Sequence, residues 1–145
     1  MMENHSETKE AEIPCHVDDR GFLYQLYKSY QFPEVKRIYL VGNYSKGVIR
    51  GFHRHNDEWK AYFVARGTAK FVLVNEQQEI ASHTLSDRRP CVLVVPPKYS
   101  HGWVSLTEET LVIGLSNKTL EESTKDDFRE DPFIFGKEVW ETKAR

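Results

Sequence analysis

Short runs of β-branched and aromatic residues, each closed by turn-forming residues, follow one another along almost the whole chain and constrain its fold more than any other feature. The runs that we expect to be strands are 22–27, 35–41, 47–53, 59–65, 69–74, 80–85, 91–95, 102–106 and 110–115. The breaks between them are rich in Gly, Asn, Asp and Pro, as turns are. Short strands at this spacing predict an all-β fold, a closed antiparallel β-sandwich or barrel of the jelly-roll type. Residues 119–130 are the only predicted helical turn, and they have no clear apolar stripe.

The chain has 145 residues, which is the size of one ordinary domain. Residues 1–12 are charged and unpatterned and are predicted to be a disordered tail, which leaves 13–145 as a single domain. The net charge of −2 offers no basic patch for nucleic acid or for a membrane surface. No apolar run approaches the roughly 20 residues that span a bilayer. The polar start is unlike a signal peptide, and Cys15 and Cys91 form no paired framework, so we expect a cytoplasmic protein with free thiols.

The residues with the most chemistry lie close together in Arg50-Gly51-Phe52-His53-Arg54-His55, followed by Glu58 and Lys60. In a strand, His53 and His55 project from the same face because side chains alternate. Two imidazoles on one face suit a metal site or a proton-transfer site. The alternative is that the two histidines have only a structural role, at the edge of the fold and packed among aromatic residues.

The spacing around this segment resembles the cupin superfamily, which implies a double-stranded β-helix jelly roll. The residues that follow its two signatures are Gly47, His53, His55, Gly67, Pro96 and His101. Lys60 stands where a metal-binding cupin has a glutamate, and an ammonium group there repels a dication. We therefore expect no metal and no cofactor. A metal-dependent cupin that uses His53, His55 and His101 remains an alternative.

Lysine at this position is typical of another branch, and the chain resembles the dTDP-4-dehydrorhamnose 3,5-epimerases over about residues 14–140. The segments that carry this resemblance are 19–22 with Gln25, 50–53, Lys60, 101–106 and 129–132. The resemblance implies a nucleotide-sugar substrate, dTDP-linked and with a ketone at C4, in deoxysugar and polysaccharide biosynthesis. It also implies a homodimer that exchanges N-terminal strands.

The same resemblance implies roles for single residues. His53 is the base that removes a proton beside the ketone, and Asp131 is the carboxylate that orients it. Lys60 stabilises the O4 oxyanion of the resulting enolate. The residues expected to bind the substrate are Arg20, Gln25, Arg50, His101 and Trp103. The two arginines suit a diphosphate because a guanidinium contacts phosphate through two hydrogen bonds.

Gly114 departs from the epimerase pattern, which has a tyrosine there to return the proton to the opposite face of the sugar. Tyr39, Tyr62 and Tyr99 are the hydroxyl groups that are available instead, and we include Tyr39 among the expected catalytic residues. Water, or no opposite-face donor at all, are the other options.

Residues 35–39 and 50–55 also resemble the dTDP-4-keto-6-deoxyhexose 3,4-ketoisomerases. That resemblance implies a second mechanism, in which the His53 and His55 pair moves a proton along one face of the sugar. The main hypothesis is an epimerase acting at C3, at C5 or at both. The alternatives are a 3,4-ketoisomerase and a non-catalytic sugar-binding cupin.

Overall fold

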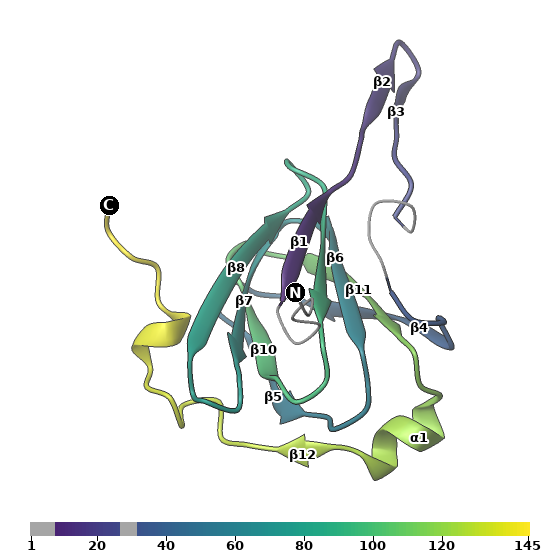
Figure 1. Ribbon diagram of the computed structural model, residues 1–145. Helices are drawn as coiled ribbons and strands as arrows, with labels where there is room; N and C mark the ends of the chain where they lie inside the picture. Colours follow the sequence, from purple (N-terminus) through teal and green to yellow (C-terminus); the bar gives the residue numbers. More distant parts are fainter. Residues whose placement is uncertain (1–7, 27–31) are drawn as a thin grey trace, which may run out of the picture.

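The computed structural model describes residues 8–26 and 32–145, and these form a β-sandwich (Figure 1). One antiparallel five-stranded sheet has the order β1 (Lys9–Glu12), β9 (Cys91–Val95), β6 (Lys60–Arg66), β11 (Thr110–Ser116), β4 (Arg37–Asn43). The facing five-stranded sheet has the order β12 (Phe128–Arg129), β5 (Ile49–Arg54), β10 (Ser100–Ser105), β7 (Thr68–Val74), β8 (Ile80–Ser86). The predicted all-β jelly-roll class is confirmed.

The predicted strands from residue 35 onward all form, with ends displaced by no more than two residues. The predicted helical segment contains α1 (Leu120–Lys125), whose capping box joins Thr119 and Glu122. A short 3-10 helix, η1 (Glu138–Trp140), follows near the end of the chain. Among the described residues, no helix is long and apolar enough to cross a membrane.

The N-terminal part differs from the expectation. Strand β1 lies inside the predicted tail, where Glu10 pairs with His83 at 2.8 Å and with Arg89 at 3.4 Å, so partners distant in sequence order this charged segment. In place of a strand over 22–27, the chain forms a hairpin of β2 (His16–Asp18) and β3 (Gly21–Leu23), which projects from the sandwich (Figure 1). The end of that predicted strand, at residue 27, lies outside the described residues.

Three apolar clusters hold the layers together. The first fills the sandwich interior, with Phe71, Leu73 and Leu93 at its centre. The second covers the outer face of the sheet that contains β6 and is completed by the N-terminal segment, and the third covers the outer face of the sheet that contains β5. In the third cluster, the ring of Trp140 packs edge-on against Phe52 with centroids 5.9 Å apart. The two ends of the chain therefore cover opposite faces of the sandwich.

A bulge between β5 and β10 makes two histidines direct neighbours on adjacent strands. The register shifts between His101 and Gly102, so that His101 pairs with His53 and Gly102 pairs with Gly51. Gly51 has a φ of +100°, and a Cβ at this position would lie 2.8 Å from the carbonyl oxygen of His101. Only glycine fits this close approach without strain.

Candidate active site

The structure gathers three histidines at one place between the sheets. The ring centroid of His53 lies 4.9 Å from that of His55 and 4.7 Å from that of His101. His53 lies on β5, His55 directly follows the last residue of this strand, and the two rings lie on the same side, as the alternation predicted. His101 comes from the neighbouring β10. The cluster is therefore built on rigid strands, which fix the geometry of a site better than loops do.

His101 is buried and is held in one protonation state. Its Nδ1 donates to the backbone oxygen of Tyr99 at 3.0 Å, because a carbonyl can only accept. Its Nε2 then accepts from the hydroxyl of Tyr62, also at 3.0 Å, and this bond joins the two sheets. Burial, helped by the nearby His53 and Lys60, holds the pKa of His101 well below its ordinary value. The ring is therefore neutral at pH 7.

His53 is more accessible, with 23% of its side chain exposed. Burial, followed by the electrostatic effects of the neighbouring His55 and Lys60, lowers the pKa of His53 to about 4, although Asp127 opposes the shift. At neutral pH the imidazole therefore has a free lone pair and can accept a proton.

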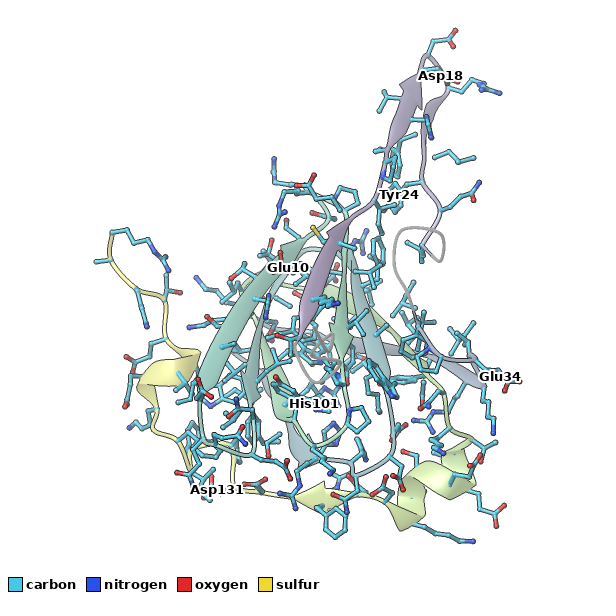
Figure 2. All side chains as sticks on the ribbon, in the orientation of Figure 1. Glu10, Asp18, Tyr24, Glu34, His101 and Asp131 are labelled. Carbon is cyan, nitrogen blue, oxygen red and sulfur yellow. The ribbon has the colours of Figure 1, made fainter. Side chains whose placement is uncertain are left out.

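The carboxylate beside His53 is Asp127, with its Oδ1 at 3.6 Å from His53 Nδ1. The predicted partner, Asp131, is exposed, and its Oδ1 accepts a hydrogen bond from the backbone N–H of Phe133 at 2.8 Å. Figure 2 shows Asp131 on the C-terminal segment, apart from His101 inside the sandwich. The predicted pairing of Asp131 with His53 is wrong, because β12 ends at Arg129 and the chain turns away before Asp131.

A carboxylate that the sequence did not single out lies at the centre of the polar interior. The side chain of Glu58 is fully buried, and its Oε1 lies 3.2 Å from Arg37 Nη2 and 3.6 Å from Lys60 Nζ. The hydroxyls of Ser116 and Ser123 donate to it at 2.5 and 2.8 Å. Burial acts to raise the pKa of Glu58, but Lys60 and the hydrogen bonds outweigh it and hold this pKa below its ordinary value. Glu58 is therefore ionised.

Lys60 lies on β6 and is buried. Its Nζ donates to the hydroxyl of Tyr39 at 3.2 Å and lies 5.0 Å from the centre of the same ring. Tyr39 comes from β4, which belongs to the sheet opposite His53. The site thus has imidazoles on one side and an ammonium group with a phenol on the other.

The ring of Tyr39 fills the space beside Gly114. Gly114 pairs with Tyr39 across β4 and β11, and a Cβ built at Gly114 would lie 2.2 Å from Tyr39 Cζ and 2.6 Å from its hydroxyl oxygen. No other residue type fits at position 114 while Tyr39 keeps this position. The phenol that the epimerase pattern has at 114 is absent here, and a phenol from the neighbouring strand lies beside that backbone.

The histidine cluster does not suit a metal ion in this arrangement. Ring nitrogens of His53, His55 and His101 lie within 4.8 Å of one another. However, both nitrogens of His101 are engaged in hydrogen bonds, and the positive charge of Lys60 acts on His53 and on His101. A divalent cation would have to break the bond to Tyr62 and would meet this ammonium group.

The remaining predicted substrate-binding residues lie elsewhere. Arg20 is at the tip of the projecting hairpin, paired with Asp18, and Gln25 is exposed just after β3. Trp103 is buried in the interior cluster against Phe71, and its expected contact with the substrate stays a prediction. Its ring is needed to fill the space between the sheets.

Arg50 lies on β5 and is hydrogen-bonded to β4 of the facing sheet. Its Nε donates to Asn43 Oδ1 at 2.8 Å, and its Nη2 donates to the backbone oxygen of Gly42 at 2.9 Å. Together with Arg66 and Tyr44, Arg50 lines a pocket of about 650 Å³ that contains none of the three histidines.

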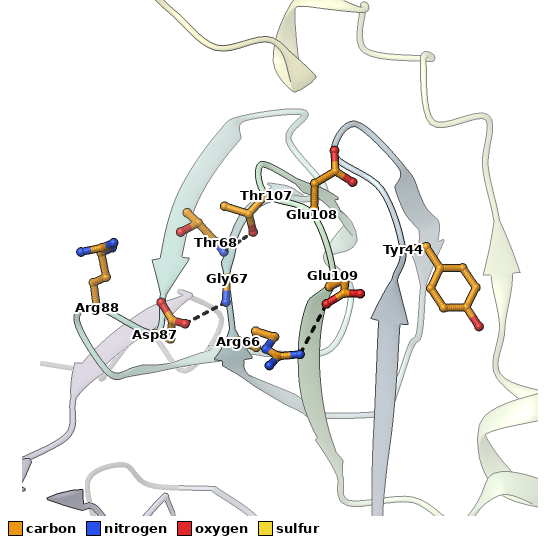
Figure 3. A pocket seen from close by; sticks show the side chains of 9 residues that line it. All are labelled: Tyr44, Arg66, Gly67, Thr68, Asp87, Arg88, Thr107, Glu108 and Glu109. Atoms are coloured by element: carbon orange, nitrogen blue, oxygen red, sulfur yellow. Dashed lines mark hydrogen bonds and ion pairs between the residues drawn. The ribbon is translucent and has the colours of Figure 1, made fainter. Parts of the chain in front are cut away.

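A second pocket, of about 610 Å³, lies at the end of β6 that is remote from Lys60 (Figure 3). The side chain of Asp87 accepts there from the backbone N–H of Gly67 at 2.9 Å, and Arg66 pairs with Glu109 at 3.6 Å. These contacts stabilise turns, and none of the predicted site residues lines this pocket.

Sequence reasoning missed Glu58, Asp127, Arg37 and Ser123 as parts of the site. Glu58 was named in the sequence beside Lys60 but was given no role. The other three come from segments that reach the site by folding. Ser123 and Asp127 lie between β11 and β12, and Arg37 begins β4. No local motif marks them, and only the three-dimensional contacts identify them.

Comparison with known proteins finds relatives by sequence and by structure. A family model described as dTDP-4-dehydrorhamnose 3,5-epimerase matches residues 5–132. Among curated proteins, the spore coat polysaccharide biosynthesis protein SpsL of Bacillus subtilis (strain 168) is 27% identical over 114 residues, which are 72% of this chain and 74% of SpsL.

Solved structures of two kinds of isomerase share the fold. A dTDP-4-dehydrorhamnose 3,5-epimerase from Bacillus anthracis, with TDP and PPi bound, has a TM-score of 0.82 at 21% identity and aligns over 99% of this chain and 90% of its own. QdtA, a sugar 3,4-ketoisomerase from Thermoanaerobacterium thermosaccharolyticum in complex with TDP, has a TM-score of 0.73 at 21% identity, over 87% of this chain and 90% of its own.

Proposed function

Since the chain belongs to the dTDP-4-dehydrorhamnose 3,5-epimerase family, we propose that it inverts C3, C5 or both in a nucleotide-linked 4-keto-6-deoxysugar through an enolate. The family makes it an isomerase of deoxysugar biosynthesis. A ketone at C4 acidifies the hydrogens on C3 and C5, so that a base can remove one of them and leave the electron pair on O4.

In this proposal His53 is the base. Its low pKa, about 4, keeps the imidazole unprotonated at pH 7, and Asp127 on its Nδ1 side orients the ring and balances the charge that forms. Lys60 lies across the site with its ammonium group directed at Tyr39. A cation there stabilises the O4 oxyanion of the enolate more than the neutral ketone.

The observation that carries the proposal is the position of Tyr39 opposite the histidines. Inversion requires that a proton leaves one face of the sugar and another arrives on the opposite face. His53 belongs to the sheet of β5, while Tyr39 belongs to the facing sheet, hydrogen-bonded to Lys60 and packed over Gly114. We assign Tyr39 as the acid that returns the proton, in the role that the tyrosine missing at 114 would have.

For the substrate we propose a dTDP-linked sugar, which is the class that names the family. Work in the cytoplasm fits the free thiols of Cys15 and Cys91.

We also propose a homodimer. The projecting hairpin exposes Val17, Phe22 and Leu23, and the edge strand β4 exposes Ile38 and Leu40 on the outer face of its sheet. An exchanged hairpin would cover such apolar surface and would carry Arg20 and Gln25 away from their own sandwich toward the second copy. The mass in solution, from light scattering, tests this directly.

Proton NMR of the protein with dTDP-4-keto-6-deoxyglucose in deuterated water tests the activity. Deuterium entering C3 or C5 with inverted configuration is the expected result. A carbonyl that moves to C3 would instead identify a 3,4-ketoisomerase that uses His53 and His55. An unchanged sugar, with titration showing that it binds, would identify a sugar-binding protein without catalysis.

A further inference from the structure

The two oxygens of the buried Glu58 carboxylate face different groups. Oε1 faces the positive side of the site, with Arg37 at 3.2 Å, Lys60 at 3.6 Å and the Ser116 hydroxyl at 2.5 Å. Oε2 faces His55, whose Nδ1 lies at 3.2 Å. The Ser123 hydroxyl, from α1, donates to Oε2 at 2.8 Å. This many partners hold the carboxylate in one orientation.

His55 is held in one tautomer by the same region. Its Nδ1 donates to the backbone oxygen of Asp126 at 2.5 Å, so the proton of the neutral ring is on Nδ1. The lone pair is then on Nε2, which is buried and has no hydrogen-bond partner among the described residues. A buried acceptor without a partner is unfavourable unless a ligand or a proton satisfies it.

His53 is poorly placed to keep a proton. Its surroundings are buried and positive, since Lys60 and Arg129 both act against its protonation and only Asp127 favours it. His55 has an ionised carboxylate at 3.2 Å instead, and the two rings lie 4.9 Å apart. Ring nitrogens of the two histidines lie within 4.8 Å, which one water molecule can bridge.

We infer that Glu58 is a positioning residue that makes His55 the acceptor of the proton that His53 removes from the sugar. The C–H bond breaks toward His53 and its electron pair passes to O4. The proton then moves to Nε2 of His55, which leaves His53 neutral and places an imidazolium against the Glu58 carboxylate. This inference rests on the proposed function and adds to it a second histidine and the carboxylate behind it.

The variant Glu58→Gln keeps the size of the side chain and removes the charge. We expect kcat to fall about 100-fold, as for loss of a general acid–base contribution, while KM changes less than threefold. Glu122→Gln is the matched control, because Glu122 is partly exposed on α1 beside Ser123, and a glutamine also completes its capping box. This control should retain the wild-type rate.

A double-variant cycle separates positioning from a merely structural role. If Glu58 acts through His55, the pair His55→Gln with Glu58→Gln should be within about threefold of His55→Gln alone. If the fold-losses in kcat of the two single variants multiply in the double variant, the inference is overturned. A Glu58→Gln protein as active as the Glu122→Gln control would also overturn it. Where Glu58→Gln fails to fold, Ser123→Ala removes one bond to Oε2 and should lower kcat about tenfold. An unchanged kcat in Ser123→Ala would overturn the inference.

Failure of the inference is distinct from failure of the proposed function. If His53→Asn abolishes deuterium exchange while Glu58→Gln leaves it at the wild-type rate, the epimerase proposal stands and the role of Glu58 falls. A wild-type protein that leaves the hydrogens on C3 and C5 unexchanged would overturn both.

Discussion

The ring of Tyr39 lies where a side chain at Gly114 would have to be. The two residues face each other across β4 and β11, and a Cβ at Gly114 would lie 2.2 Å from Tyr39 Cζ and 2.5 Å from its Cε2. The tyrosine is partly buried and packs against the interior cluster, so it cannot move aside freely. These positions on two strands therefore behave as one packing unit.

Gly114→Ala should destabilise the protein by about 1–3 kcal/mol, the usual penalty for overfilling a packed interior. Urea unfolding followed by circular dichroism measures this. Adding Tyr39→Ala removes the clash, so the double variant should be more stable than the sum of the two single effects predicts. If the losses of stability in the two single variants simply add in the double variant, Tyr39 and Gly114 do not pack as one unit.

Tyr39→Phe keeps the ring over Gly114 but removes the hydroxyl that accepts from Lys60. We expect deuterium exchange at the sugar carbon to continue while inversion slows about 10²- to 10⁴-fold, because only the returning proton is affected. Tyr24→Phe, in the cluster on the outer face of the sheet, is the control. Equal slowing of exchange and inversion would place Tyr39 outside the role of acid.

Lys60→Met removes the cation beside the expected oxyanion and should lower kcat about 10²- to 10³-fold, with a smaller effect on KM. The variant also takes one positive neighbour from Glu58, so thermal unfolding must be measured in parallel. Lys118→Met, which removes a lysine that pairs with Glu122 at 3.9 Å, is the control for loss of a lysine. A Lys60→Met protein with wild-type kcat would rule out oxyanion stabilisation by this residue.

Asp127→Asn should lower kcat about tenfold or more, since it takes the balancing charge from beside His53. Asp131→Asn should leave kcat unchanged, because the carboxylate of Asp131 only accepts a hydrogen bond in an exposed turn. The reverse order of effects would restore Asp131 as the partner of His53.

Stability should fall as the pH drops from about 6.5 to about 4. In this range an unfolded histidine, with a pKa of about 6.5, binds a proton that the folded His53, with a pKa of about 4, does not bind. The unfolded state thus binds more protons, and the contribution of His53 is at most about 3 kcal/mol, less the effect of its partial exposure. His101 acts in the same direction. The midpoints of urea unfolding between pH 7 and pH 4 measure this loss of stability. In the His53→Gln variant, stability should depend less on pH.

Sequence patterns were sufficient for most of the fold. Alternation and turn residues place every strand from β4 to β11, because each of these strands has one face in an apolar cluster and ends in a local turn. The strand β1 was missed because its order comes from pairing with β9 and from charges on distant residues, such as His83. A local sequence pattern does not indicate partners that are distant in the sequence.

For the candidate site, the sequence indicated only the residues that lie on strands or directly beside them. His53, Lys60 and His101 lie on strands whose alternation fixes the direction of their side chains, and His55 directly follows β5. Asp131 was misplaced by family spacing alone, because the exact path of the segment after α1 decides which aspartate meets His53. Trp103 was assigned to substrate because an aromatic ring can stack or fill a core, and only its burial distinguishes the two.

The order in which the chain is synthesised gives the segment after β11 a particular importance. β1 to β11 are complete at Ser116, yet Ser123, the Asp126 carbonyl and Asp127 are made later and contact Glu58, His55 and His53 from outside the sandwich. α1 and β12 lie along one end of the fold (Figure 1). A growing chain therefore carries all three histidines before it carries the groups that orient two of them. The groups that orient His53 and His55 therefore come into place only after the segment from Ser123 to Asp127 has been synthesised and has docked against the sandwich.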